Sequence, residues 1–176
     1  MNIFIFSTNP VEAARFYPDK IVNKISLEIC QMIGINYGED YLDWGVIPKK
    51  NGEPYKSKNH AHRNHPCTRF LRENEVNLAW GITHGLALAL EHGYRKGKVP
   101  ATYKTLLHSK KIFEQKTGMN LCLWEKIQDS DFVRAMKHCP EIMDDESISN
   151  VEAYRRYVLT KPYKDIYSRR EKPDFI

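Results

Sequence analysis

The stretch from about Asn74 to Tyr94 most constrains the fold, because it carries a helical apolar pattern over more than five turns without a proline. A helix of this length spans a small domain, so the remaining elements must pack around it. Trp80 lies on the apolar side and is expected in the core. The predicted buried seam comprises Val76, Trp80, Thr83, Ala87, Leu90 and Tyr94, widened by Leu78, Ile82, Leu86 and Ala89. The pattern favours a mainly α, compact single-domain helical bundle.

A line of polar residues interrupts this apolar helix. Asn77, His84, Glu91 and Arg95 follow one another at spacings of seven, seven and four, which places them on one face. They form either a buried polar network or a stripe that faces a substrate. The second alternative makes all four candidate substrate or DNA contacts.

Capping signals predict further helices around this one. Asn9 and Pro10 start a short helix that Pro18 ends, and a second helix runs from Asp19 to about Ile33, with Gly34 as its stop. The His65–Pro66 step begins another helix. Two more are predicted over residues 102–116, closed by a glycine at 118, and 150–159.

Three segments are expected outside helices. Residues 2–7 form a short buried strand or an extended arm packed on the core. Residues 34–66 have no helical period, and Asn51–Gly52 predicts a small hairpin there. Residues 161–176 form a basic surface tail behind a single helical domain, residues 1–160.

Length and composition fit a globular protein of 176 residues, 41% of them hydrophobic. No apolar run approaches the roughly 20 residues of a membrane span, and the N-terminus lacks the features of a signal peptide. We expect a cytoplasmic protein (in the host cytoplasm if a phage encodes it) with no membrane partner. The four cysteines are expected as reduced thiols. The oligomeric state stays open, with a monomer as the working expectation.

Charge is unevenly distributed along the chain, whose formal net charge is +5. Five basic residues and no acidic residue lie in 56–72, and seven basic residues against one acidic residue lie in 95–116. Residues 141–152 carry five acids and no lysine or arginine. Such segregation indicates either an anionic partner, most commonly nucleic acid, or solvated helix faces.

Histidines and a cysteine gather between the second predicted helix and the long central one. His60, His62, His65 and Cys67 include good zinc ligands, but their spacing matches no zinc pattern, so we expect neither a metal nor a cofactor. Contact with an anion or substrate is favoured over a packing role. Arg63, Arg69 and Arg72 are the candidate phosphate-binding residues beside them.

Glu28 shares a helix face with Lys20 and Lys24, which are further candidate DNA-binding residues. A carboxylate held near ammonium groups stays ionised and can move a proton or stabilise a cationic transition state. The alternative is an ordinary surface ion pair, and for Glu28 taken alone this alternative is favoured.

Several stretches together resemble a family of small phage and bacterial proteins, the pyrimidine dimer DNA glycosylases. They are Asp19-Lys20-Ile21-Val22-Asn23-Lys24 to Glu28, His62-Arg63-Asn64-His65-Pro66-Cys67 to Arg72, Asn77-Leu78-Ala79-Trp80 to His84, residues 91–98, and residues 153–157. The histidine–proline block with the following asparagine–tryptophan helix is the most specific part.

The resemblance implies a DNA glycosylase and abasic-site lyase that acts on damaged pyrimidines. An N-terminal amine then attacks the sugar carbon and forms a Schiff base, and a helix glutamate assists, a role that falls on Glu28. His65 joins Glu28 as a catalytic candidate. The family exposes its amine by removing methionine, whereas Asn2 usually leaves Met1 in place, so Met1 is the candidate nucleophile.

Two alternatives to that activity remain open from the sequence. One is a non-catalytic nucleic-acid-binding or host-factor-blocking phage protein. The other is an enzyme that acts on a modified base or a nucleotide, with the Asn77, His84 and Glu91 stripe as its pocket.

Overall fold

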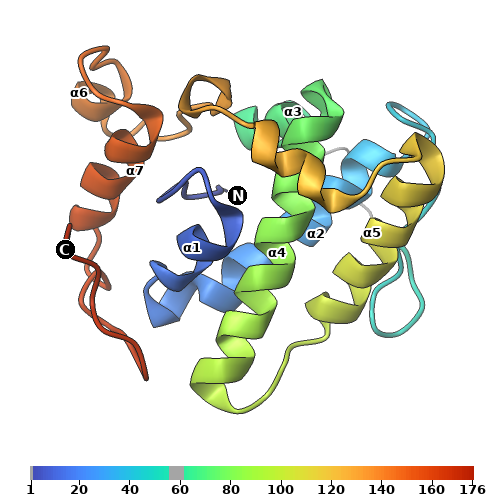
Figure 1. The fold of residues 1–176 in the computed structure, drawn as a ribbon, viewed down its shortest axis with the longest axis horizontal. Coiled ribbons are helices and arrows are strands. Elements are labelled where there is room, and N and C mark those ends of the chain that lie inside the picture. Colours follow the sequence, from blue (N-terminus) through green and yellow to red (C-terminus); the bar gives the residue numbers. More distant parts are fainter. Residues whose placement is uncertain (1, 56–61) are drawn as a thin grey trace.

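Helix α4 (Glu75–Lys96) is the central element of the fold, and α1, α2, α3, α5 and the 3-10 helix η2 all pack on it (Figure 1). The computed structural model describes residues 2–55 and 62–176. The elements are α1 (Pro10–Arg15), α2 (Asp19–Tyr37), α3 (Pro66–Glu73), α4, α5 (Thr102–Thr117), η2 (Leu121–Lys126), η3 (Asp129–Asp131), α6 (Pro140–Met143) and α7 (Asn150–Leu159). The mainly helical single domain is therefore confirmed.

The limits of α4 follow from its capping residues. The side chain of Asn74 accepts a hydrogen bond from the backbone N–H of Asn77, and Gly97 ends the helix with a φ of +76°. Trp80 is fully buried, and its indole N–H donates to the carbonyl of Thr8. Trp80 thus belongs to the core, as its position in the apolar pattern predicts.

The predicted apolar seam of α4 is wrong at its C-terminal end. Leu90 and Tyr94 are half exposed, whereas Ala89, predicted beside the seam, is buried together with Leu88, which the prediction left out. The buried side of the helix is centred near Gly81, Leu88 and Arg95, about 100° around the helix axis from the seam. The seam therefore runs along the border of the buried side.

The polar line of α4 lies inside the protein. The exposed fractions of Asn77, His84, Glu91 and Arg95 are 1%, 0%, 6% and 3%. Asn77 donates to the carbonyl of Phe70, His84 contacts the carbonyl of Pro10 and the hydroxyl of Tyr17, and Arg95 pairs with Glu91. All four side chains are buried and bonded to groups inside the protein, so their prediction as substrate or DNA contacts is corrected.

Helix α2 continues one turn past its predicted end and stops at Tyr37. Gly34, predicted as the stop, is inside the helix, where the backbone of Tyr55 approaches it closely. The glycine is needed for this close approach and not for a turn. Asp19 is the first residue of α2, as predicted, and its carboxylate binds Arg95, Lys96 and Ser168.

Replacing Gly34 by alanine is expected to destabilise the fold by about 1–3 kcal/mol, despite the better helix propensity of alanine. A Cβ atom at residue 34 would lie 2.8 Å from Cβ and 2.9 Å from the carbonyl oxygen of Tyr55. The midpoint of thermal or urea unfolding measures the effect. Asn23→Ala, at an exposed position of the same helix, is the control and should change stability by less than about 0.5 kcal/mol.

The N-terminal segment is an extended arm and not a strand. Within the described ranges no strand forms, and the arm's backbone bonds to side chains instead. The hydroxyl of Tyr17 bonds the N–H and carbonyl of Phe4, and Arg155 donates to the carbonyl of Phe6. The ring of Phe4 also stacks on Tyr157. The arm is thereby fixed between α1 and α7.

The remaining irregular segments pack on this helical frame. A single antiparallel bridge between Pro48 and Pro54 makes the small hairpin, with Gly52 at a φ of +81°. The segment after α7 runs beside α1 (Figure 1), where Phe175 packs on Phe16 and on Phe6 of the arm. Arg170 of the same segment pairs with Glu91 of α4. None of the described helices has the length and apolarity needed to cross a membrane.

Candidate functional site: a basic pocket beside the N-terminal arm

A pocket of about 670 Å³ opens where the N-terminal arm meets α2 and α7. We call it the N-terminal pocket. Four of the site residues predicted from the sequence line it: Lys24, Glu28, His62 and His65. Its other lining residues are Asn2, Phe4, Ile21, Ile25, Pro66, Arg134, Ala135, Met136, Lys137, His138, Met143, Tyr157, Lys161 and Tyr163.

Glu28 contacts the start of the chain inside this pocket. The backbone N–H of Asn2 donates to Oε2 of Glu28 over 3.0 Å, and Nζ of Lys24 lies 3.9 Å from Oε1. The exposed fraction is 13% for the Glu28 side chain and 65% for the Lys24 side chain. Glu28 is therefore more than a surface ion pair, because one of its oxygens is held by the N-terminal arm.

Two further contacts fix the position of Asn2. Its side-chain amide donates to the carbonyl of Ala135 over 2.8 Å, and the thiol of Cys67 donates to its Oδ1 over 3.3 Å. Burial raises the pKa of Cys67 to about 11, so the thiol keeps its proton at neutral pH. The first residues of the arm are thus tied to α2, α3 and the segment before α6.

His65 caps α3 and lines the pocket at the same time. Its Nδ1 accepts a hydrogen bond from the N–H of Cys67, so the ring proton of the neutral form is on Nε2. Burial lowers the pKa of His65 to about 4, and the positive charges of His62 and Lys137 add to the shift. At neutral pH His65 therefore offers the pocket an uncharged N–H donor.

The titration of His65 predicts acid destabilisation. The folded protein binds this proton less readily than the unfolded chain, so the free energy of unfolding is highest above pH 6.5 and falls as the pH approaches 4. The loss due to His65 is at most about 3 kcal/mol. His84, whose pKa burial also lowers to about 4, contributes in the same direction.

His65→Asn isolates the His65 contribution, because asparagine also caps helices but does not titrate. Urea unfolding at pH 4 and pH 7 should show a smaller loss of stability for this variant than for the wild type. An equal loss in both proteins would mean that His65 does not titrate between these pH values.

Three basic residues of the pocket were missed by the sequence interpretation. Lys137, His138 and Lys161 come from the segment before α6 and from the end of α7. Arg134 also lines the pocket, but its guanidinium donates to four backbone carbonyls of residues 142–148, which gives it a structural role. No sequence pattern marks these residues, because isolated basic side chains in irregular segments have no period.

Other predicted residues lie near the pocket but outside it. Arg72 donates to the carbonyl of Arg63 and stacks on Tyr41, while Arg63 donates to the hydroxyl of Tyr41. Lys20 is exposed on α2, 6.0 Å from the ring of Tyr163. Arg69 lines a neighbouring pocket on α3.

Two predicted residues fall outside the described ranges, namely Met1 and His60. In the part of the chain that is described, no group of three histidine, cysteine or acidic side chains is arranged to hold a metal ion. Cys67 is buried and bound to the arm, and all four cysteines are free thiols.

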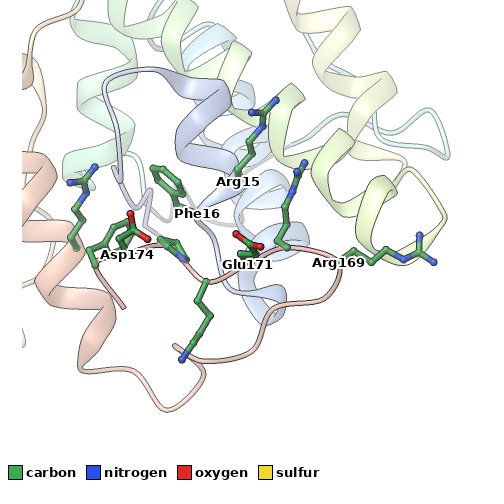
Figure 2. A pocket seen from close by; sticks show the side chains of 10 residues that line it. Arg15, Phe16, Arg169, Glu171 and Asp174 are labelled. Carbon is green, nitrogen blue, oxygen red and sulfur yellow. The ribbon is translucent and has the colours of Figure 1, made fainter.

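A larger pocket of about 770 Å³, which we call the C-terminal pocket, lies under the C-terminal segment (Figure 2). None of the predicted site residues lines it. The carboxylates of Glu171 and Asp174 lie among its arginines (Figure 2). Arg155 and Arg170 are engaged with the carbonyl of Phe6 and with Glu91. The mixed charge and the engaged guanidinium groups make it a weaker candidate than the N-terminal pocket.

No family model, no curated protein sequence and no solved structure matches the chain.

Proposed function

We propose that the protein is a DNA glycosylase and abasic-site lyase that acts on damaged pyrimidines, with an N-terminal α-amine as its nucleophile and Glu28 as its proton-transfer residue. The observation that carries the proposal is the 3.0 Å contact between the backbone nitrogen of Asn2 and Glu28 in a basic pocket. The resemblance of the His62–Arg72 and Asn77–His84 stretches to pyrimidine dimer glycosylases agrees with it.

The start of the chain supplies the amine. The α-amine of a chain that begins at Met1 is one residue from the nitrogen that contacts Glu28, and removal of Met1 turns that nitrogen itself into the α-amine. An α-amine has a reference pKa near 8, so a useful fraction is neutral and nucleophilic at physiological pH. The adjacent carboxylate can accept the proton that the amine loses on attack.

The reaction then proceeds through an imine between the amine and the sugar. The amine bonds to C1′ of the damaged nucleotide as the bond from C1′ to the base breaks; the base leaves with the electron pair and takes a proton from water, while Glu28 takes the proton that the amine loses. Glu28 passes this proton to O4′ as the sugar ring opens, which gives an iminium ion between the amine and C1′ and leaves Glu28 ionised. Glu28 takes a proton from C2′, the C3′–O bond breaks by β-elimination, and water releases the amine. His65, neutral at pH 7, donates a hydrogen bond to an oxygen of the sugar or phosphate.

The charge of the pocket supports a nucleic-acid substrate. Lys24, Lys137 and Lys161 line it from three separate segments, against the single carboxylate of Glu28. Lysines so placed hold phosphates on either side of a nucleotide drawn out of the duplex. The alternative pocket at Asn77, His84 and Glu91 loses support, since these side chains are buried and bonded within the protein.

Borohydride trapping tests the proposal. The protein is incubated with an oligonucleotide duplex that carries an abasic site, and sodium borohydride is added to reduce any imine. We expect a covalent protein–DNA adduct when borohydride is present, and strand cleavage when borohydride is left out. Binding of the duplex with neither adduct nor cleavage would contradict the proposal and favour a non-catalytic DNA-binding protein.

A further inference from the structure

The N-terminal pocket adjoins a second pocket on α3. This α3 pocket has a volume of about 590 Å³ and is lined by Pro66, Arg69, Phe70, Arg72, Glu73 and Val133. Pro66 lines both pockets, and residues 133–135 pass from the wall of one to the wall of the other. The two pockets therefore share one wall, formed by Pro66 and residues 133–135.

The shared wall is held rigidly. The hydroxyl of Tyr154 donates to the carbonyl of Val133 over 2.9 Å and accepts from the N–H of Ala135 over 3.1 Å. Phe132, the preceding residue, packs its ring against Phe70 and Trp80. Because the wall is fixed from both ends, the spacing between the two pockets is set before any ligand arrives.

The α3 pocket contains one uncommitted cationic group. The side chain of Arg69 is exposed and makes no ion pair or hydrogen bond to any described residue. Arg72 is engaged with the carbonyl of Arg63 and the ring of Tyr41. Pro66 and Val133 give the pocket apolar surface beside Arg69. A guanidinium above apolar surface suits a phosphodiester followed by a sugar or base.

We infer that the two pockets together bind a continuous polynucleotide strand. The reacting nucleotide occupies the N-terminal pocket, and the neighbouring part of the strand crosses Pro66 so that its phosphodiester contacts Arg69. The α3 pocket is thereby the site for the part of the strand next to the reacting nucleotide. This inference rests on the proposed function, because it places the reacting nucleotide in the N-terminal pocket.

Binding as a function of strand length tests the inference. The probes carry a tetrahydrofuran abasic analogue, which has no aldehyde and forms no imine, either as the single phosphorylated residue or at the centre of a nine-residue single strand. We expect the wild type to bind the longer strand more tightly. Arg69→Gln should weaken binding of the longer strand about fivefold and leave binding of the short probe unaffected. It should also reduce the slope of log affinity against log salt concentration for the longer strand by about 0.7, because one phosphate contact is lost.

Arg15→Gln is the matched control, since Arg15 is exposed, lines the C-terminal pocket and has no side-chain partner among the described residues. It should leave both affinities unchanged. Equal affinity for short and long probes, or equal weakening of both by Arg69→Gln, overturns the inference. A borohydride adduct without length dependence would leave the proposed function standing alone. Arg69-dependent affinity for long strands without an adduct would support the strand-binding site and contradict the proposed lyase activity.

Discussion

Replacing Glu28 by glutamine is expected to slow strand cleavage at an abasic site by about 10²- to 10⁴-fold, the range for loss of a general acid or base. Glutamine has nearly the same shape and can still accept a hydrogen bond from the N–H of Asn2, so the arm should keep its position. It can neither accept the proton of the attacking amine nor remove the C2′ proton. Single-turnover cleavage of a labelled oligonucleotide measures the change.

The control for Glu28→Gln is Glu125→Gln, which makes the same change at an exposed position of η2. It should cleave at the wild-type rate. The affinity of Glu28→Gln for the tetrahydrofuran strand should stay within about twofold of the wild type or rise slightly, because one negative charge is lost near phosphates. If Glu28→Gln cleaved the strand at the wild-type rate, the carboxylate of Glu28 would have no role in the mechanism.

Replacing Arg95 by methionine is expected to cost about 3–5 kcal/mol of stability. The guanidinium lies 2.7 Å from Oε1 of Glu91 and 2.9 Å from Oδ1 of Asp19, and it donates to the carbonyls of Tyr17 and Arg15. Burial favours protonation of Asp19, yet hydrogen bonds from Lys96, Ser168 and Arg95 outweigh it and keep the pKa of Asp19 well below its ordinary value. Methionine leaves both carboxylates buried with fewer partners.

Lys96→Met is the control for Arg95→Met. Lys96 also pairs with Asp19, at 2.8 Å, but its side chain is 44% exposed, so its removal should cost less than about 1 kcal/mol. Urea unfolding of the three proteins measures the difference. Similar losses of unfolding free energy in the two variants would mean that burial of Arg95 does not make its ion pairs more stabilising than the exposed pair of Lys96.

Local signals predicted the helices well where the ends are set by capping residues. The start of α4 near Asn74, the α3 start at His65–Pro66 and the Gly118 stop of α5 are each decided by the residue itself and its immediate neighbours. Gly34 was misread because its role depends on Tyr55, 21 positions away, which no local pattern contains.

The candidate site was predictable only in part, for a related reason. Lys24 and Glu28 face each other because they are one helical turn apart, and His62 and His65 share a short turn before α3. Lys137 and Lys161 reach the same pocket only through the packing of α7 and the segment before α6. The polar line of α4 gave two equal alternatives, since periodicity places side chains on a face without showing what covers that face.

The most direct measurement is the location of the reduced adduct. After borohydride trapping on an abasic oligonucleotide, trypsin digestion should leave the N-terminal peptide, which ends at Arg15, as the modified fragment. Mass spectrometry should place the sugar on its α-amine. A sugar attached to the side chain of Lys24 or Lys137, or the absence of any adduct, would contradict an N-terminal amine beside Glu28 as the nucleophile.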